Sequence, residues 1–285
     1  MLAEIWIHPA NRHRRVRALA LAAFWQVWKR VVRQPLTIRY HGFRLPCHPG
    51  SRLASAAVYF GTWPDYWEMR FVRDYLRAGD RFVDVGANIG LYSLLAASVV
   101  GPGGRVVAFE PGREPAARLH ETLVLNRFGN IELVRSAVGE QPGDLVFDAG
   151  DEDATAHVSE KTGSPGERVP VVRLDEVLDD RPYAMAKFDI EGYEPFALRG
   201  MRRLLAVGNP PVFLIEAAGY SKRYGIETHD LMREIESWHY RPMIYDPDTH
   251  QLCPAPAHWE SGLPNVLCVF EGARDFVAGR LARQS

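Results

Sequence analysis

The middle and C-terminal parts of the chain alternate short apolar runs with segments whose apolar residues repeat at helical spacing. The short runs predict strands at 82–85, 105–109, 131–134, 184–190, 211–216, 240–245 and 265–270. The helical spacing predicts helices at 90–99, 113–127, 194–206 and 227–238. Strands that alternate with helices form a mostly parallel sheet with helices on both faces and right-handed crossovers. We therefore predict a doubly wound α/β fold.

The first 35 residues predict an amphipathic helix with basic flanks. Its apolar positions are Val16, Ala20, Ala23, Phe24, Val27, Trp28 and Val31. The cations beside this stripe are Arg12, Arg14, Arg15, Arg17, Lys29, Arg30 and Arg33, and no acid occurs in residues 12–33. Two interpretations stay open: peripheral contact of residues 12–33 with a membrane, and packing on the protein or on a second subunit. The longest apolar run, Ala18–Trp25, is shorter than the roughly 20 residues of a transmembrane helix.

A small module links this helix to the α/β pattern. Leu36–Cys47 is typical of one or two short strands, and Met69–Leu76 has helical period. Residues 140–168 are rich in Gly, Asp, Glu, Ser and Thr. This composition predicts a hairpin and a mobile loop, which we expect to lie over the ligand-binding site of the α/β domain. The predicted parts of the chain are a basic amphipathic helix at 1–35, a lid module at 36–80 and an α/β domain at 81–285.

Charge and cysteine content narrow the class of protein. Lys and Arg number 34 against 35 Asp and Glu, so the overall charge gives no reason to expect a nucleic-acid partner. The three cysteines, Cys47, Cys253 and Cys268, lie far apart and indicate neither a zinc site nor a disulfide framework. This usage is typical of a reducing compartment. We expect a cytoplasmic protein, peripheral to the inner face of a membrane if residues 12–33 bind lipid.

The stretch Phe82–Ala96 places an apolar strand, a glycine turn and an apolar helix in succession. Gly86 and Gly90 permit a backbone turn against which a ligand can lie. The spacing Gly-x-Asn-x-Gly is neither the Gly-x-Gly-x-x-Gly of dinucleotide folds nor a phosphate-binding P-loop. The next strand ends in Glu110, and a carboxylate at that place can accept two ribose hydroxyls.

With these segments the chain resembles the S-adenosylmethionine-dependent methyltransferases, and more closely the FkbM family of O-methyltransferases. The resemblance is carried by Val83–Tyr92, Ala108–Pro111, Asn126, Ser136–Gly139, Arg173–Val177 and Lys187–Glu194. It implies a class I, Rossmann-like fold and methyl transfer to a hydroxyl group of a small acceptor such as a saccharide, glycolipid or secondary metabolite. It identifies neither the acceptor nor the oligomeric state.

The resemblance and the fold together suggest roles for the residues at the carboxyl ends of the strands, where open parallel sheets bind ligands. Asp84 would orient the glycine loop or the amino group of the methionine moiety, and Glu110 would hold the ribose. The remaining expected cofactor contacts are the loop residues Gly86, Asn88 and Gly90, the residues Pro111, Ser136, Ala137 and Val138 around the adenine, and Asp189.

Methylation of an alcohol also needs a group that takes the hydroxyl proton. Asp189 is the first candidate base, because it follows the fourth strand opposite the glycine loop. Glu191 is the second candidate, although it could instead cap the following helix. Asp189 and Glu216 also resemble, by position, the acids that hold a magnesium ion in catechol-type O-methyltransferases, and such an ion would lower the pKa of the acceptor hydroxyl.

Two other functions stay open on the sequence alone. One is a noncatalytic binding module that kept the cofactor fold and is recruited to a membrane or partner. The other is a nicotinamide-dependent oxidoreductase, which the missing dinucleotide glycine pattern disfavours.

Overall fold

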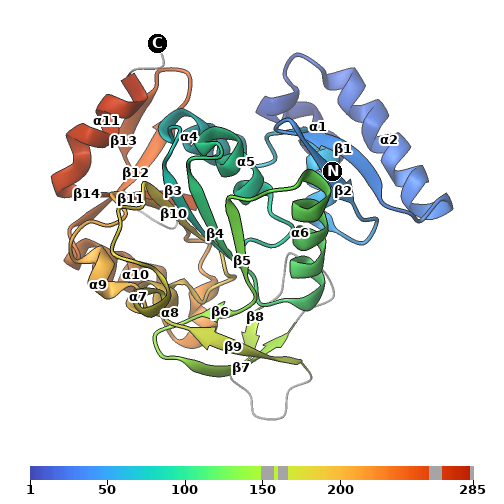
Figure 1. Cartoon of the computed structure of the whole chain (residues 1–285). Helices are drawn as coiled ribbons and strands as arrows, with labels where there is room; N and C mark the ends of the chain where they lie inside the picture. The colour runs from blue at the N-terminus through green and yellow to red at the C-terminus, as the bar shows by residue number, and fades with distance from the viewer. Residues whose placement is uncertain (149–156, 160–165, 257–264, 283–285) are drawn as a thin grey trace.

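The computed structural model describes residues 1–148, 157–159, 166–256 and 265–282. An eight-stranded sheet forms its centre (Figure 1). Its strands are β3 (Arg81–Val85), β4 (Arg105–Phe109), β5 (Ile131–Val134), β10 (Met185–Phe188), β11 (Val212–Glu216), β12 (Tyr240–Asp246), β13 (Gln251–Pro254) and β14 (Asn265–Phe270). They lie in the order β13-β12-β14-β11-β10-β3-β4-β5.

The five strands from β11 to β5 are parallel, whereas β14 is antiparallel to β11 and β12, and β13 is antiparallel to β12. The predicted doubly wound, mostly parallel sheet is therefore confirmed. The chain runs from β3 to β4 and β5 on one side, and later to β10 and β11 on the other. This reversal of strand order puts a ligand-binding crevice at the carboxyl ends of β3 and β10.

Alternate side chains of the strands enter two cores. Phe82, Val106 and Met185 face a core that includes α4 (Tyr66–Tyr75), α5 (Leu91–Val100) and α11 (Arg274–Ala282). Val83, Val107 and Ala186 face the opposite core. The helices on that second face are α7 (Leu174–Val177), α8 (Glu194–Arg199), α9 (Arg202–Leu205) and α10 (Thr228–Ser237). The remaining helix of the α/β part is α6 (Arg113–Asn126), beside β5 in Figure 1.

Two segments differ from the sequence prediction. The helix expected at 194–206 is two short helices, α8 and α9, because the backbone leaves the helical conformation at Met201, with φ −112° and ψ 12°. The predicted hairpin at 140–168 exists as β7 (Gly143–Asp148) and β9 (Glu167–Val172), and it forms a second sheet with β6 (Ala137–Val138) and β8 (His157–Ser159). Most of the expected loop lies outside the described residues.

The N-terminal elements pack on the α/β domain. They are α1 (Leu2–Ile7), α2 (Arg15–Val31), the hairpin β1 (Leu36–Tyr40) and β2 (Phe43–Cys47), and α3 (Arg52–Phe60), which the sequence analysis missed. The buried Trp25 of α2 donates its indole hydrogen bond to the Ser55 hydroxyl of α3, at 2.9 Å. Within the described ranges, no helix has both the length and the apolar character that crossing a bilayer requires.

Candidate active site

The glycine loop lies directly against the end of β10. Gly86 has φ +82°, and a Cβ atom there would lie 1.9 Å from the carbonyl oxygen of Asp189. Gly90 has φ +89°, and its Cβ would lie 2.4 Å from Leu119 Cδ1 of α6. The space that a side chain would need is thus occupied by the protein itself. Both glycines are required for the close packing of loop, strand and helix that shapes the crevice.

Glu110 ties the end of β4 to the glycine loop. Its carboxylate accepts hydrogen bonds from the backbone N–H groups of Asn88 and Gly112, both at 2.8 Å. Burial raises the pKa of Glu110 to about 7, an effect that these two hydrogen bonds oppose. Asn88 itself has a left-handed backbone, with φ 50°. The structure therefore brings together the predicted ribose acid and the loop residue.

Asp84 lies beneath the loop and is fully buried. The Ser93 hydroxyl of α5 donates to its Oδ2 at 2.6 Å, and within the described residues its Oδ1 has no hydrogen-bond partner. Burial raises the pKa of Asp84, and the nearby Lys187 counteracts that effect. Because Asp84 does not line the cavity described next, its position favours the loop-orienting one of its two predicted roles.

An open cavity of about 130 Å³ lies at the carboxyl edge of the sheet. The predicted site residues that line it are Gly86, Asn88, Glu110, Pro111, Ala137, Val138, Asp189 and Glu191. Gly90, Ser136 and Glu216 are not among its lining residues. The lining also includes residues that the sequence analysis did not assign to the site, namely Leu53, Asp65, Ala87, Leu91, Tyr92, Pro115, Lys187, Ile190 and Tyr193.

Lys187 is a buried cation between two acids. Its Nζ lies 2.9 Å from Asp189 Oδ2 and 4.7 Å from the ring centroid of Tyr92. In the sheet it pairs with Asp84 of β3. Burial alone would lower the pKa of Lys187, but Asp189 and Asp84 outweigh burial and raise it. Lys187 therefore neutralises charge under the cavity and fixes the position of Asp189.

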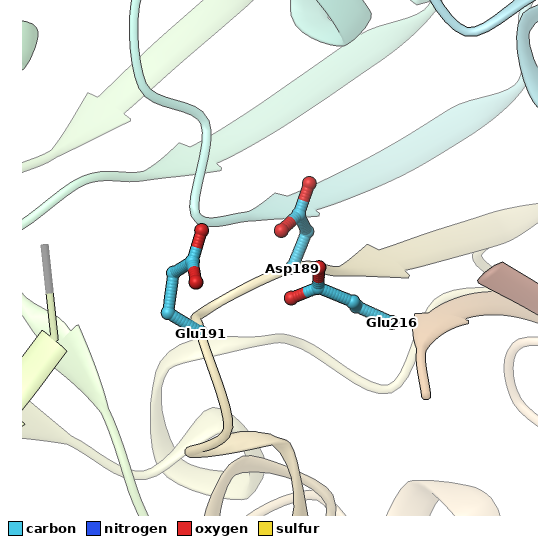
Figure 2. Close-up of side chains that lie close together, drawn as sticks. All are labelled: Asp189, Glu191 and Glu216. Carbon is cyan, nitrogen blue, oxygen red and sulfur yellow. The ribbon is translucent and has the colours of Figure 1, made fainter. Parts of the chain in front are cut away.

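Asp189, Glu191 and Glu216 gather beyond the ends of β10 and β11 (Figure 2), and each places one carboxylate oxygen within 4.8 Å of the others. Burial, with the charge of Asp189 second, raises the pKa of Glu191 to about 7 and that of Glu216 to about 9. Glu216 Oε2 is buried without a hydrogen-bond partner among the described residues. Glu191 does not cap the following helix, because the N-cap of α8 is Tyr193. Glu194 instead accepts hydrogen bonds from the loop N–H groups of Ile190 and Gly192.

This group of three carboxylates fits a hard divalent cation, which prefers oxygen ligands. The sequence analysis named Asp189 and Glu216 as candidate ligands and found no third. The structure supplies Glu191, whose left-handed backbone, with φ 56°, is rare for a residue other than glycine. In the sequence, the one available sign that Glu191 belongs with these ligands was the Asp-x-Glu spacing after the strand predicted at 184–190.

The lid module contributes one acid to the lining of the cavity. Asp65, the N-terminal cap residue of α4, lines the cavity, and burial followed by the charge of Asp189 raises its pKa. Glu68 follows one helical turn later, and burial raises its pKa to about 7. By contrast, the aromatic residues of this module do not line the cavity, and Tyr59, Phe60 and Tyr66 are buried in the protein.

The family model of the methyltransferase FkbM domain matches residues 84–242. A methyltransferase FkbM from Methylobacillus flagellatus is 18% identical, with a TM-score of 0.47 over 90% of this chain, and this chain spans 59% of that protein.

Two further solved structures show lower similarity to the chain. An S-adenosylmethionine-dependent O-methyltransferase from Thermotoga maritima is 13% identical, with a TM-score of 0.39 over 71% of this chain and 63% of its own. Aeropyrum pernix fibrillarin, in complex with S-adenosyl-L-methionine, is 14% identical, with a TM-score of 0.41 over 82% of each chain. No curated protein matches the sequence. The family assignment rests on the family model, since all three TM-scores lie below 0.5.

Proposed function

The chain belongs to the FkbM methyltransferase family, and on that basis we propose that it transfers a methyl group from S-adenosylmethionine to a hydroxyl group of a small acceptor, such as a saccharide, glycolipid or secondary metabolite. The observation that carries this proposal is the composition of one cavity. It joins the Glu110–Asn88 pair, which suits a ribose, to the carboxylates of Asp189 and Glu191, which suit removal of a hydroxyl proton. The two halves of a methyl-transfer site thus open into the same space.

Each half has a role that follows from its chemistry. S-adenosylmethionine, when bound, supplies a methyl group on a positively charged sulfur. Glu110 would accept hydrogen bonds from the ribose, and Pro111, Ala137 and Val138 would give apolar contact to the adenine. The acids beyond β10 would orient the acceptor hydroxyl, since most of the rate of an in-line displacement comes from alignment.

We place proton acceptance at Glu191. Asp189 was the first candidate from sequence, but its carboxylate is held in an ion pair by Lys187, with 2.9 Å between Nζ and Oδ2. The pKa of Glu191 is raised to about 7, which is close to the value at which a general base is most effective near neutral pH. In this arrangement Lys187 positions Asp189, Asp189 holds the acceptor, and Glu191 takes the proton.

A divalent cation on Asp189, Glu191 and Glu216 is an alternative form of the proposal, in which Glu191 is a ligand of the cation and not the base. It is supported by the short separation of their oxygens and by the unpartnered, buried Glu216 Oε2. When bound, such an ion would lower the pKa of the acceptor hydroxyl. The cation would then offset the repulsion among the three carboxylates, which protons bound to the acids offset when no cation is present.

Calorimetric titration with S-adenosylhomocysteine tests the cofactor, with NAD and NADP as controls and each titration repeated in EDTA. We expect saturable binding of S-adenosylhomocysteine alone. Binding of a nicotinamide cofactor in its place would identify an oxidoreductase. Binding of none of the three would favour the noncatalytic module and overturn the proposal.

A further inference from the structure

Helix α2 has two apolar faces, of which the protein covers one. Ala18, Ala22 and Trp25 face the core and are at most 1% exposed. The stripe seen in the sequence lies on the other face, where Val16, Phe24, Val27 and Val31 are 75%, 47%, 61% and 74% exposed. Ala20 and Ala23 of the same stripe are also exposed. Trp28, the remaining residue of the predicted stripe, is partly buried against the core. Packing on the protein therefore explains one face of the helix and leaves the rest of the predicted stripe open to solvent.

Cations surround this outer face, which we define as Val16, Ala20, Ala23, Phe24, Val27 and Val31. The exposed cations at its two ends are Arg12, Arg15, Arg17, Arg30 and Arg33. No Asp or Glu occurs anywhere in residues 5–64. Residues 5–64 thus present an exposed apolar stripe flanked by basic side chains, and Glu4 of α1 is the last acid before it in sequence.

Helix α1 extends the patch. Leu2, Trp6 and Ile7 are 64%, 42% and 72% exposed, and the Arg15 guanidinium lies 5.4 Å from the centroid of the Trp6 ring. Aromatic rings and arginines side by side are typical of surfaces that lie at the boundary of water and lipid.

We propose that the outer face of α2 binds the surface of a membrane that contains anionic phospholipids. The apolar stripe would enter the boundary between headgroups and acyl chains, while the arginines contact lipid phosphates. Charge favours an anionic membrane over a second copy of the chain as the binding partner of this face. Two copies of the patch placed face to face would set arginines against arginines, a repulsion that an anionic lipid surface does not have.

The proposal also places the cavity near the membrane. Trp25 on the inner side of α2 donates a hydrogen bond to Ser55 of α3. Leu53, also in α3, lines the cavity. Because packed helices are separated by about 8–10 Å, the cavity lies roughly one helix layer below the lipid surface. If the proposed function holds, an acceptor carried by a lipid would reach the site. The membrane binding itself does not depend on that function.

Flotation of the full chain with vesicles tests the proposal. We expect binding to vesicles of phosphatidylcholine mixed with phosphatidylglycerol, weak binding to phosphatidylcholine alone, and loss of binding at high salt. Val31→Glu should weaken binding at least tenfold, whereas Val207→Glu, at a valine that is 73% exposed elsewhere, should not. Replacing Arg15, Arg30 and Arg33 together by Gln should weaken binding roughly 100-fold. The matched control replaces the exposed Arg168, Arg202 and Arg233.

Three results would overturn the proposal. They are absence of binding to the anionic vesicles, equal binding by the Val31→Glu and Val207→Glu proteins, and equal binding to neutral vesicles. A concentration-dependent dimer by light scattering that Val31→Glu abolishes would identify a second copy of the chain as the occupant instead. Thermal unfolding of each variant shows whether a loss of binding reflects a loss of the fold.

Discussion

Lys187 and Asp84 stand side by side on neighbouring parallel strands, and the ammonium group of Lys187 also reaches Asp189, 2.9 Å away. The buried ammonium group of Lys187 thus provides positive charge both for Asp84, under the glycine loop, and for Asp189, in the cavity. This relationship couples the stability of the fold to the geometry of the site, because both acids depend on the same counter-charge.

Lys187→Met should destabilise the protein by about 3 kcal/mol near neutral pH, since removing one partner leaves buried acid without a counter-charge. The loss should shrink at lower pH, because burial raises the pKa of Asp84 and allows this acid to take up a proton. Chemical unfolding at both pH values measures it. Lys222→Met is the matched control, because that lysine is 60% exposed in a surface ion pair. Equal effects of the two substitutions would contradict a special role for Lys187.

Glu110→Ala should weaken binding of S-adenosylhomocysteine about tenfold to 100-fold, because hydrogen bonds to a charged group contribute roughly 1.5–3 kcal/mol. Calorimetry measures the change. Glu114→Ala, at an exposed acid of the first turn of α6, is the control and should bind as the unmodified protein does. If Glu110→Ala binds with unchanged affinity, the carboxylate does not hold the ribose.

Glu191→Gln should lower turnover about 100-fold or more while leaving S-adenosylhomocysteine binding nearly unchanged. In the unmodified protein, turnover should rise as pH passes through about 7, because the base must lose its proton before it can accept one. The variant should lack this rise. Initial rates across pH with any acceptor that proves active provide the measurement, and a rise that persists in Glu191→Gln would move the base to another residue.

The sequence predicted the sheet better than the site. Strands at 105–109 and 131–134 coincide with β4 and β5, because apolar runs bounded by turns depend on local sequence alone. The role of Lys187 depends on a cross-strand neighbour 103 positions away in sequence, and no local pattern carries that information. Glu191 joins the acid cluster because its backbone is left-handed. A glycine at this position would have indicated such a backbone in the sequence, whereas a glutamate does not.

The outer stripe of α2 shows a similar division. The helical spacing of its apolar residues could be recognised in the sequence. That periodicity could not show which of the two apolar faces of α2 packs against the protein core. Ala18, Ala22 and Trp25 are the residues that are buried in the core, and Trp25 finds a hydrogen-bond partner in Ser55 of α3.

Gly86→Ala should destabilise the protein by more than about 3 kcal/mol, because the added methyl group meets the Asp189 carbonyl and the backbone is left-handed. Gly225→Ala separates these two causes. Gly225 has φ +75° but no atom within 4 Å of the Cβ position, so strain alone should cost about 1–2 kcal/mol. Thermal unfolding of both variants gives the comparison. Similar losses would mean that the loop moves away from β10 at little cost.

Glu216→Gln tests whether the acid cluster carries protons or a cation. The pKa of Glu216 is raised from its usual value to about 9, so its stabilising contribution is complete below about pH 4.5 and is lost as pH rises toward 9. Without divalent ions, the melting temperature of the unmodified protein should therefore fall between about pH 6 and pH 8.5 more steeply than that of the variant.

Magnesium should remove this difference, because a cation on Asp189, Glu191 and Glu216 replaces the shared protons and stabilises the ionised cluster. We expect added Mg²⁺ to raise the melting temperature of the unmodified protein at about pH 8.5, with little effect on Glu216→Gln, and EDTA to reverse the gain. Glu227→Gln, at an acid outside the cluster, is the control and should respond as the unmodified protein does. A Mg²⁺ effect of equal size in Glu216→Gln would place the ion elsewhere, and parallel pH profiles would show that Glu216 ionises freely.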